Sequence, residues 1–243
     1  LLNGRKHSRR DVKTLETTTT LQQVADAAIA ELHKASKAYG ETCALDRVDL
    51  RIDPGQLTAV LGPNGAGKST AISLFLGLLE PEAGPATIFG PSALDIQPRR
   101  KIGVMMQSVE LPRELRVREL VALAASYYPD PRPLDDILAF AGITELADRM
   151  YGKLSGGQKR QVQFAMAVCG RPRLLFLDEP TVGLDVTARQ TLWTAVRTLL
   201  KDGCSIVLTT HNLEEAEALA DYVVVLEGAS IGRVEHVAAG DPA

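Results

Sequence analysis

The feature that most constrains the fold of this chain is a glycine-rich loop set between two apolar stretches. The loop runs from Gly62 to Thr70 as Gly-Pro-Asn-Gly-Ala-Gly-Lys-Ser-Thr, which fits the phosphate-binding spacing of Gly, four residues and Gly-Lys-Ser. Residues 57–61 predict a buried strand, and residues 70–79 predict a buried helix. In that context the loop N–H groups and the positive helix end form an anion site, to which Lys68 adds a charge. The competing interpretation, a glycine-rich turn before an ordinary helix, is weaker than a nucleoside triphosphate site.

The composition is that of a globular protein with a substantial core. The 243 residues are 45% apolar and 23% charged, which allows one large α/β domain or a domain with a subdomain. The net charge of −3 gives no basic footprint, so we expect no nucleic acid partner. Cys43, Cys169 and Cys204 are widely spaced, which favours reduced thiols over a disulfide framework or a zinc site. No apolar stretch approaches the roughly 18 residues of a membrane span, so any membrane part is expected on another chain.

The first 28 residues differ from the rest of the chain. They carry a basic cluster between Arg5 and Lys13 and a run of four threonines, and helical spacing of apolar residues predicts a short helix over 21–29. We interpret residues 1–28 as a basic, polar extension that is partly disordered. The alternative is an arm that contacts anionic lipid or a partner chain.

From residue 29 onward, strands and helices alternate. Two strands around a turn at 40–42 predict a small antiparallel sheet, and strands that alternate with helices predict a mostly parallel one. Between about 108 and 165, helices broken by prolines predict an inserted helical subdomain. The predicted strands are 30–35, 44–52, 57–61, 88–90, 102–106, 174–180, 205–210 and 222–226, and the predicted helices are 70–79, 117–127, 134–141, 162–168, 187–200 and 213–220.

Polar residues stand at the ends of several predicted strands. Gly62, Gln107 and His211 each follow a strand, and Asp178 ends another. Because ligands of parallel sheets bind at the carboxyl ends of the strands, we expect these four residues to converge on one edge. Asp178 is placed to hold Mg²⁺ through water, and Glu179 to orient or deprotonate an attacking water. The alternative for this acidic pair is a plain strand end that enters a turn.

A second glycine motif, Leu154-Ser155-Gly156-Gly157-Gln158, precedes an apolar helical stretch. Ser155 is a good helix N-cap, and two glycines leave the helix N-terminus bare, which makes a second anion site. Taken alone, the motif could equally be a capped helix.

Together these motifs resemble the nucleotide-binding subunit of ATP-binding-cassette (ABC) transporters over about residues 29–228. Gly62–Thr70 looks like the Walker A loop, Leu154–Gln158 like the family signature, and Leu174–Glu179 like Walker B with its glutamate. Gln107 resembles the Q-loop glutamine, residues 183–185 resemble the D-loop, and His211 resembles the H-loop histidine. The resemblance implies a P-loop NTPase fold of the α/β class, with a mostly parallel sheet, a small antiparallel β subdomain and an inserted helical subdomain.

The resemblance also implies the roles of individual residues, with ATP and Mg²⁺ as cofactors. It places Mg²⁺ on Ser69, Gln107 and Asp178, and catalysis on Lys68, Gln107, Glu179 and His211. Asp185 would couple two sites across a subunit interface. The residues implied to bind ATP are Tyr39, Gly62, Pro63, Asn64, Gly65, Ala66, Gly67, Lys68, Ser69 and Thr70, and those implied to act on the ATP of a second subunit are Ser155, Gly156, Gly157 and Gln158.

The resemblance further implies partners and a location. ATP would drive dimerisation of two cassettes, most simply two copies of this chain, at the cytoplasmic face of a membrane. A permease on another chain would dock a helix on residues 108–151. The sequences of Gly183–Arg189 and Thr209–Glu217 look most like those of the stand-alone ATPase subunits of bacterial drug or lipid exporters. Asn212 departs from the pattern of that branch of the family, which often has an aromatic residue there. The short tail after Gly228 also favours export.

Two other functions compete with transport. A soluble ABC ATPase that acts on ribosomes or DNA usually carries two cassettes or a long coiled coil, and this sequence has one cassette and no long heptad run. A regulatory cassette that does not hydrolyse ATP would typically have replaced Glu179, His211 or Ser155, and all three are present.

Overall fold

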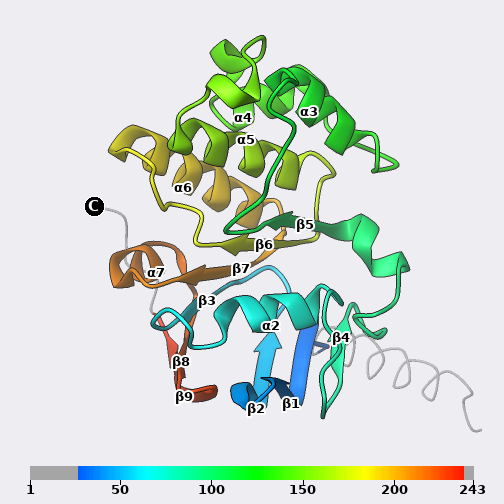
Figure 1. Ribbon diagram of the computed structural model, residues 1–243, viewed down its shortest axis with the longest axis vertical. Coiled ribbons are helices and arrows are strands. Elements are labelled where there is room, and N and C mark those ends of the chain that lie inside the picture. Colours follow the sequence, from blue (N-terminus) through cyan, green and yellow to red (C-terminus); the bar gives the residue numbers. More distant parts are fainter. Residues whose placement is uncertain (1–26, 238–243) are drawn as a thin grey trace, which may run out of the picture.

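The computed structural model describes residues 27–237, in which a six-stranded sheet separates two cores (Figure 1). One core lies between the sheet and the helices α3 to α7, and the other lies between the sheet, α2 and a second, three-stranded sheet. Successive residues of the central strands point into opposite cores. Leu175 and Leu177 face the helices, whereas Leu174 and Phe176 face α2. This two-sided burial explains why the central strands read as continuous apolar runs.

The large sheet has the order β5-β6-β7-β3-β8-β9. Its strands are β3 (Leu57–Leu61), β5 (Ile102–Met105), β6 (Leu174–Asp178), β7 (Ser205–Thr210), β8 (Tyr222–Glu227) and β9 (Ser230–His236). All neighbours are parallel except β8 and β9. The register pairs Leu61 with Thr210 and Asp178 with Thr209, so the carboxyl ends of β3, β6 and β7 lie at one edge. The P-loop α/β fold predicted from the sequence is therefore confirmed.

The small sheet is antiparallel, in the order β2-β1-β4. It consists of β1 (Ala30–Tyr39), β2 (Thr42–Ile52) and β4 (Ala86–Ile88), and α2 (Lys68–Phe75) packs against it. The predicted turn between the first two strands is present, and Gly40 adopts φ 59 there. Only glycine tolerates that left-handed conformation without strain.

The helices that cover the other face of the large sheet come from two parts of the chain. In the chain, the first group follows β5 and precedes β6, and the second group alternates with the later strands (Figure 1). The helices are α3 (Val117–Ala125), α4 (Leu134–Phe140), α5 (Gly156–Val168), α6 (Val186–Lys201) and α7 (Leu213–Leu219). Of the 3₁₀ turns, η1 (Gln97–Lys101) precedes β5, and η2 (Thr144–Leu146) and η3 (Tyr151–Lys153) lie between α4 and α5 in the chain. The boundary of a helical subdomain near 108–165 stays a prediction.

Some element boundaries differ from those predicted. The helix expected over 70–79 begins at Lys68 and ends at Phe75, because Gly77 turns the chain at φ 60 against the main chain of Ala93. The strand expected at 88–90 ends at Ile88. Strand β9 was missed, because an edge strand that is open on one side does not need a continuous apolar pattern.

Predictions for residues 1–26 lie outside the described part of the chain, which includes the basic extension and most of the helix expected over 21–29. Residues 27–29 are described and are not helical. Among residues 27–237, no helix is both long and apolar enough to cross a membrane.

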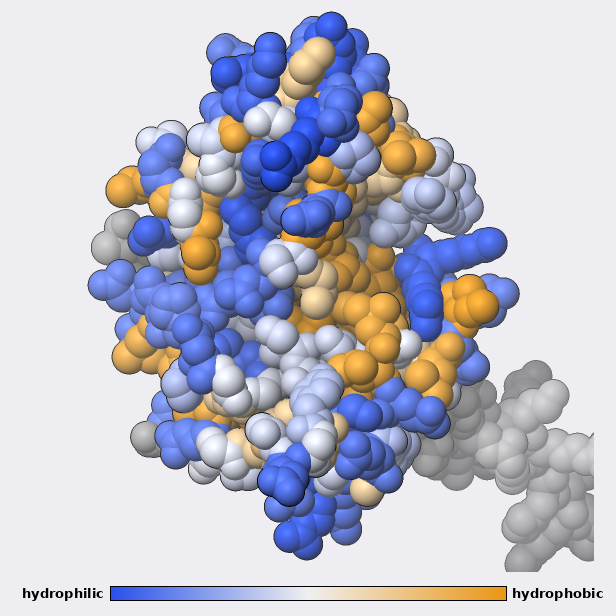
Figure 2. Space-filling view, in the orientation of Figure 1, coloured by the Kyte–Doolittle hydropathy of each residue, from blue (hydrophilic) through white to orange (hydrophobic). Residues whose placement is uncertain are grey.

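Figure 2 shows one face of the molecule, on which apolar side chains gather in a hollow between the upper helices and the part below β5. Three exposed apolar side chains lie in the connecting segments of this part of the chain. Leu78 lies just after α2, and Leu94 and Ile96 lie just before η1.

Candidate functional site

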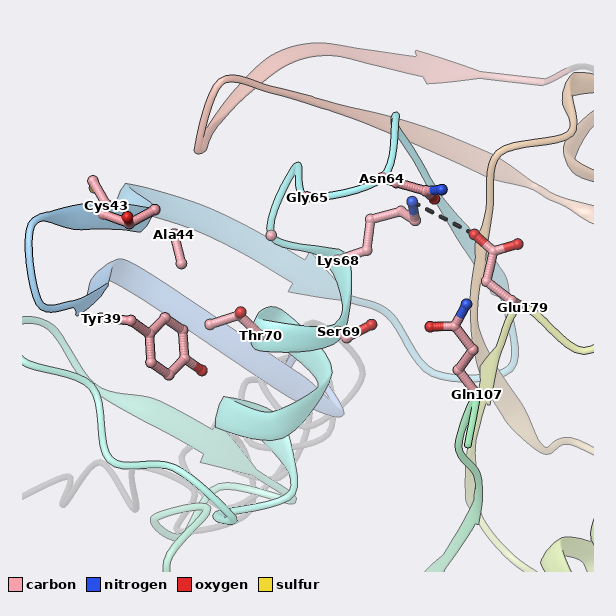
Figure 3. A pocket seen from close by; sticks show the side chains of 12 residues that line it. Tyr39, Cys43, Ala44, Asn64, Gly65, Lys68, Ser69, Thr70, Gln107 and Glu179 are labelled. Carbon is pink, nitrogen blue, oxygen red and sulfur yellow. Dashed lines mark ion pairs between the residues drawn. The ribbon is translucent and has the colours of Figure 1, made fainter. Parts of the chain in front are cut away.

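The loop between β3 and α2 is shaped as a cradle around the Lys68 side chain (Figure 3). Lys68 is buried, and its Nζ donates hydrogen bonds to the carbonyl oxygens of Gly62 at 2.7 Å and Pro63 at 3.1 Å. Gly67 adopts φ 101, and a Cβ there would collide with the carbonyl oxygen of Ala44 and with Leu45. The loop therefore needs glycine at 67 for both its conformation and its packing.

A pocket of about 510 Å³ opens over this loop. Tyr39, which is half exposed, borders it from the end of β1, and Gln107 and Glu179 border it from the ends of β5 and β6 (Figure 3). The complete lining is Tyr39, Thr42, Cys43, Ala44, Asn64, Gly65, Gly67, Lys68, Ser69, Thr70, Gln107 and Glu179. The structure thus brings together most residues predicted to bind the nucleotide, whereas Gly62, Pro63 and Ala66 shape the loop outside the lining.

Asp178 lies just behind the pocket with hydroxyl groups on both of its carboxylate oxygens. Ser69 Oγ donates to Oδ2 at 3.0 Å, and Thr209 Oγ1 donates to Oδ1 at 2.5 Å. The carboxylate is almost fully buried. Such a hydroxyl and carboxylate pair fits a hard cation such as Mg²⁺, which prefers oxygen ligands and retains several waters. Residues 27–237 contain no group of three or more His, Cys, Asp or Glu suited to a metal.

Glu179 is held in an unusual backbone conformation at the end of β6. Its φ is 50, which costs a non-glycine residue about 1–3 kcal/mol when the surroundings impose it. Its N–H donates to the carbonyl oxygen of Thr209 at 3.0 Å, and its side chain is 4% exposed. The carboxylate lies between two basic groups. Oε1 is 3.5 Å from Lys68 Nζ, and Oε2 is 2.7 Å from His211 Nδ1.

The two oxygens of this carboxylate are not equally satisfied. Oε2 has a hydrogen-bond partner in the His211 ring, whereas Oε1 is buried and has none among the described residues. The His211 side chain is 57% exposed, so it faces solvent while it contacts Glu179. The arrangement is a buried proton acceptor between a cation and an exposed imidazole.

A second buried carboxylate, Glu215 in α7, supports the segment that carries His211. Thr210 Oγ1 donates to Glu215 Oε2 at 2.7 Å, and the N–H of Asn212 donates to Thr210 Oγ1 at 3.0 Å. Burial raises the pKa of Glu215 and the nearby Glu179 raises it further, whereas the hydrogen bond from Thr210 and the nearby polar groups of Thr181 and Trp193 lower it. The sequence did not single out Glu215, because its burial is decided by how α7 packs.

The structure places Ser155–Gln158 at the start of α5 and not in the pocket. Ser155 Oγ accepts from the N–H of Gln158 at 3.2 Å, and Gln158 Oε1 accepts from the N–H of Ser155 at 3.1 Å. This capping box confirms the N-cap predicted at Ser155. Ser155 and Gly156 are exposed. Within one chain, the four residues predicted to act on the nucleotide of a second subunit therefore do not line the Lys68 pocket.

Sequence comparison finds related proteins over most of the chain. A family model described as "ABC transporter" matches residues 45–182. The Nod factor export ATP-binding protein I of Rhizobium etli is 40% identical over 200 residues, which are 79% of this chain and 63% of that protein. Its counterpart in Mesorhizobium japonicum is 36% identical over 92% of this chain and 72% of that protein. The chain spans less than two thirds of the first three such relatives, at 63%, 64% and 61%.

Solved structures with the same fold include two ATP-binding cassettes. One is described as the ATP binding subunit of an ABC transporter, with a TM-score of 0.80 and 30% identity over 86% of this chain and 90% of that chain. The other is a dimeric post-hydrolysis cassette bound to ADP and Pi, with a TM-score of 0.79 and 26% identity over 87% of this chain and all (100%) of that chain.

Proposed function

This chain belongs to the ABC transporter family, and we propose that it is the ATP-binding and ATP-hydrolysing subunit of an exporter with a separate permease. The observation that carries the proposal is the pocket over Gly62–Thr70, in which a buried lysine, a strained acidic residue and a glutamine meet. Its size suits a nucleotide, since small-molecule pockets are typically about 300–1,000 Å³.

Phosphate binding is assigned to the loop amides and Lys68. The Nζ of Lys68 is anchored on two carbonyl oxygens, so its charge is fixed in position before a phosphate arrives. Ser69, Asp178 and Gln107 would hold Mg²⁺, which neutralises phosphate charge when it is bound. Tyr39 is assigned to stack on the base from the rim of the pocket.

Hydrolysis is assigned to Glu179 and His211. An entering phosphate competes with Glu179 Oε1 for Lys68, whose Nζ lies 3.5 Å away. The carboxylate then has an unpaired oxygen that can accept a proton from the attacking water. His211 holds the other oxygen at 2.7 Å and faces solvent, which suits a group that contacts the γ-phosphate.

The signature residues support a dimer in which each chain completes the site of the other. Ser155 and Gly156 are exposed, and a Cβ on Gly156 would meet nothing within 4 Å in the described part of the chain. A glycine at a helix start with open space around it has no packing reason within the chain. We assign its role to the close approach of ATP held by a second copy, because both half-sites are present in this sequence.

The permease is proposed to dock over the hollow of Figure 2, beside the segment that follows Gln107. A helix of the permease would cover exposed apolar side chains there, and closure of the dimer would be transmitted through Gln107 and the 108–151 segment. The chain would then lie at the cytoplasmic face of the membrane. Export is proposed from relatives named for Nod factor export.

Purification of the chain from its native membranes in mild detergent tests this function. We expect ATP hydrolysis that requires Mg²⁺ and a co-purifying protein with several membrane spans. A Lys68→Ala chain is the matched control, since it should retain the membrane partner and lose hydrolysis. Recovery with ribosomes or nucleic acid, and without a membrane protein, would instead favour a soluble ABC ATPase.

A further inference from the structure

Arg160 is a buried cation that the nucleotide pocket itself does not contain. It lies in the first turns of α5, two residues after Gln158, and its side chain points into the protein toward the sheet. It is 8% exposed. A buried arginine is costly to desolvate, so its hydrogen-bond partners indicate what it is kept for.

The two terminal nitrogens of Arg160 reach two neighbouring strand ends. Nη1 donates to the carbonyl oxygens of Met106 at 2.8 Å and Gln107 at 3.1 Å, just after β5. Nη2 donates to the carbonyl oxygens of Asp178 at 2.9 Å and Glu179 at 2.5 Å, at the end of β6. One planar guanidinium therefore bridges the main chain of β5 and β6 where both strands end.

The orientation of this guanidinium is itself fixed. Gln163, one turn further along α5, accepts from Nη1 at 3.0 Å and donates to the Tyr151 hydroxyl at 3.4 Å. Burial lowers the pKa of Arg160, and the negative charges of Asp178 and Glu179 raise it again. Arginine stays protonated in such sites because its intrinsic pKa is so high. The result is a charged fork of fixed geometry between four carbonyl oxygens.

We propose that Arg160 is a positioning residue that fixes the main chain of Gln107 and Glu179 relative to the helix that carries Ser155 and Gly156. The proposal rests on the proposed function, because it assigns Gln107 to Mg²⁺ and Glu179 to the attacking water. Arg160 touches neither nucleotide nor metal in this assignment. It acts through the carbonyl groups of the two residues that do.

The backbone of Glu179 explains why such a restraint is needed. At φ 50 the residue is held in a conformation that the chain would leave if its neighbours released it. Its N–H is held by Thr209 from β7, and its carbonyl oxygen is held by Arg160 from α5. Since α5 begins with the signature residues, a contact made there by a second subunit moves the fork and the two carbonyl groups together.

Lysine can replace the charge of Arg160 but not its geometry. An ammonium group is a compact donor on a flexible stem and cannot span two strands in one plane. We therefore expect Arg160→Lys to lower kcat for ATP about tenfold or more, since misplacement of about 1 Å can cost that much. KM for MgATP should change less than about twofold, because the phosphate loop is untouched. Arg197→Lys, an exposed arginine of α6 that donates to Ala218, is the matched control.

Two further measurements separate positioning from folding. Hydrogen exchange in the full-length Arg160→Lys chain should be faster than in the parent for peptides that cover 106–108 and 178–181. Exchange over β3 should be the same in both chains. Arg160→Ala should regain part of its kcat when guanidinium chloride is added, and should gain nothing from sodium chloride at equal ionic strength.

A folded Arg160→Lys chain with wild-type kcat would overturn the positioning role. A parallel loss of kcat, nucleotide affinity and thermal stability would also overturn it, because that pattern marks a merely structural residue. If the unaltered chain hydrolyses no ATP, alone or with its co-purified membrane partner, the proposed function fails and this inference fails with it. The first two results leave the proposed function intact.

Discussion

The two glycine motifs of this chain differ in what satisfies them. In the loop before α2, Gly67 is required by its own chain, because its left-handed backbone lies against Ala44 and Leu45. At the start of α5, Gly156 has open space around it among the described residues, and its backbone is ordinary helix. The first loop encloses a buried lysine, whereas the second leaves the capped start of α5 open to solvent.

Such a difference is expected of a nucleotide site that is divided between two chains. The loop over Lys68 is preorganised by contacts within one chain, so binding of phosphate there needs little rearrangement. The start of α5 gains nothing from Gly156 until something outside approaches. A glycine that is conformationally unnecessary and solvent-exposed is therefore the better indicator of an intermolecular role.

Glu179→Gln should give the largest effect and tests whether the two motifs meet. The amide cannot accept the proton of water, so ATP hydrolysis should fall about 10²–10⁴-fold. ATP binding should remain, and the chain should form an ATP-dependent dimer that persists, measured by light scattering after gel filtration. A variant that stays monomeric with saturating MgATP would break the division of the site between two chains.

Lys68→Ala should affect the first motif alone. Loss of a charged donor to phosphate costs about 1.5–3 kcal/mol, which corresponds to about a ten- to hundredfold weaker ATP affinity. A titration with a fluorescent ATP analogue measures this. Lys101→Ala is the control, because that exposed lysine lies at the opposite end of β5. Equal affinity of the Lys68→Ala and Lys101→Ala chains would contradict the assignment of Lys68.

The substitutions Gly67→Ala and Gly156→Ala test the difference between the two glycine motifs. We expect Gly67→Ala to lower both thermal stability and ATP affinity, because its Cβ has no room and its φ is unfavourable. Gly156→Ala should leave stability unchanged or raise it by up to about 1 kcal/mol, while ATP hydrolysis and dimer formation fall. Melting temperature and phosphate release are the measurements. If Gly156→Ala hydrolysed ATP normally, no second chain would need the space at that helix end.

The smallest effect is expected from Glu215→Gln as a function of pH. Because burial raises the pKa of Glu215 above the ordinary value of a glutamate, the folded state binds its proton more tightly than the unfolded state. The contribution of this group to stability is full below about pH 4.5 and is lost as pH rises through the raised pKa. The melting temperature of Glu215→Gln, relative to that of the parent, should therefore rise between pH 4.5 and pH 7.5.

A shift of about 2–4 °C per kcal/mol makes that difference measurable in a chain of this length. The groups that face the carboxyl are Thr210, Thr181, Trp193 and Glu179. Glu217→Gln, on the exposed side of α7, controls for the change in net charge. If the difference in melting temperature between Glu215→Gln and the parent were constant over this pH range, the raised pKa of Glu215 would be refuted.

Local sequence predicted those residues whose surroundings are built by their own neighbours in the chain. Gly62, Lys68 and Ser69 belong to one loop, and Ser155 caps the helix that it precedes, so spacing alone located them. The expectation that Gly62, Gln107, Asp178 and His211 converge on one edge followed from the general geometry of parallel sheets. Gln107 lines the pocket, and so does Glu179, which follows Asp178. Their chemical roles stay proposals.

Residues whose position depends on packing between distant segments were not found in advance. Thr209 reaches Asp178 only because β6 and β7 pair in register, and the sequence contains no local sign of that pair. Thr42, Cys43 and Ala44 line the pocket because the small sheet folds against α2. A residue of this kind is visible only when the segment that faces it is placed.

The α/β fold, the phosphate loop and the capped start of α5 can be predicted from the sequence, because each depends on hydrogen bonds and periodicity within a short stretch. That Arg160 joins the ends of β5 and β6, and that Glu179 is strained between Lys68 and His211, follows only from how distant segments pack. Buried charges require partners, and in this chain those partners come from strands and helices far apart in sequence.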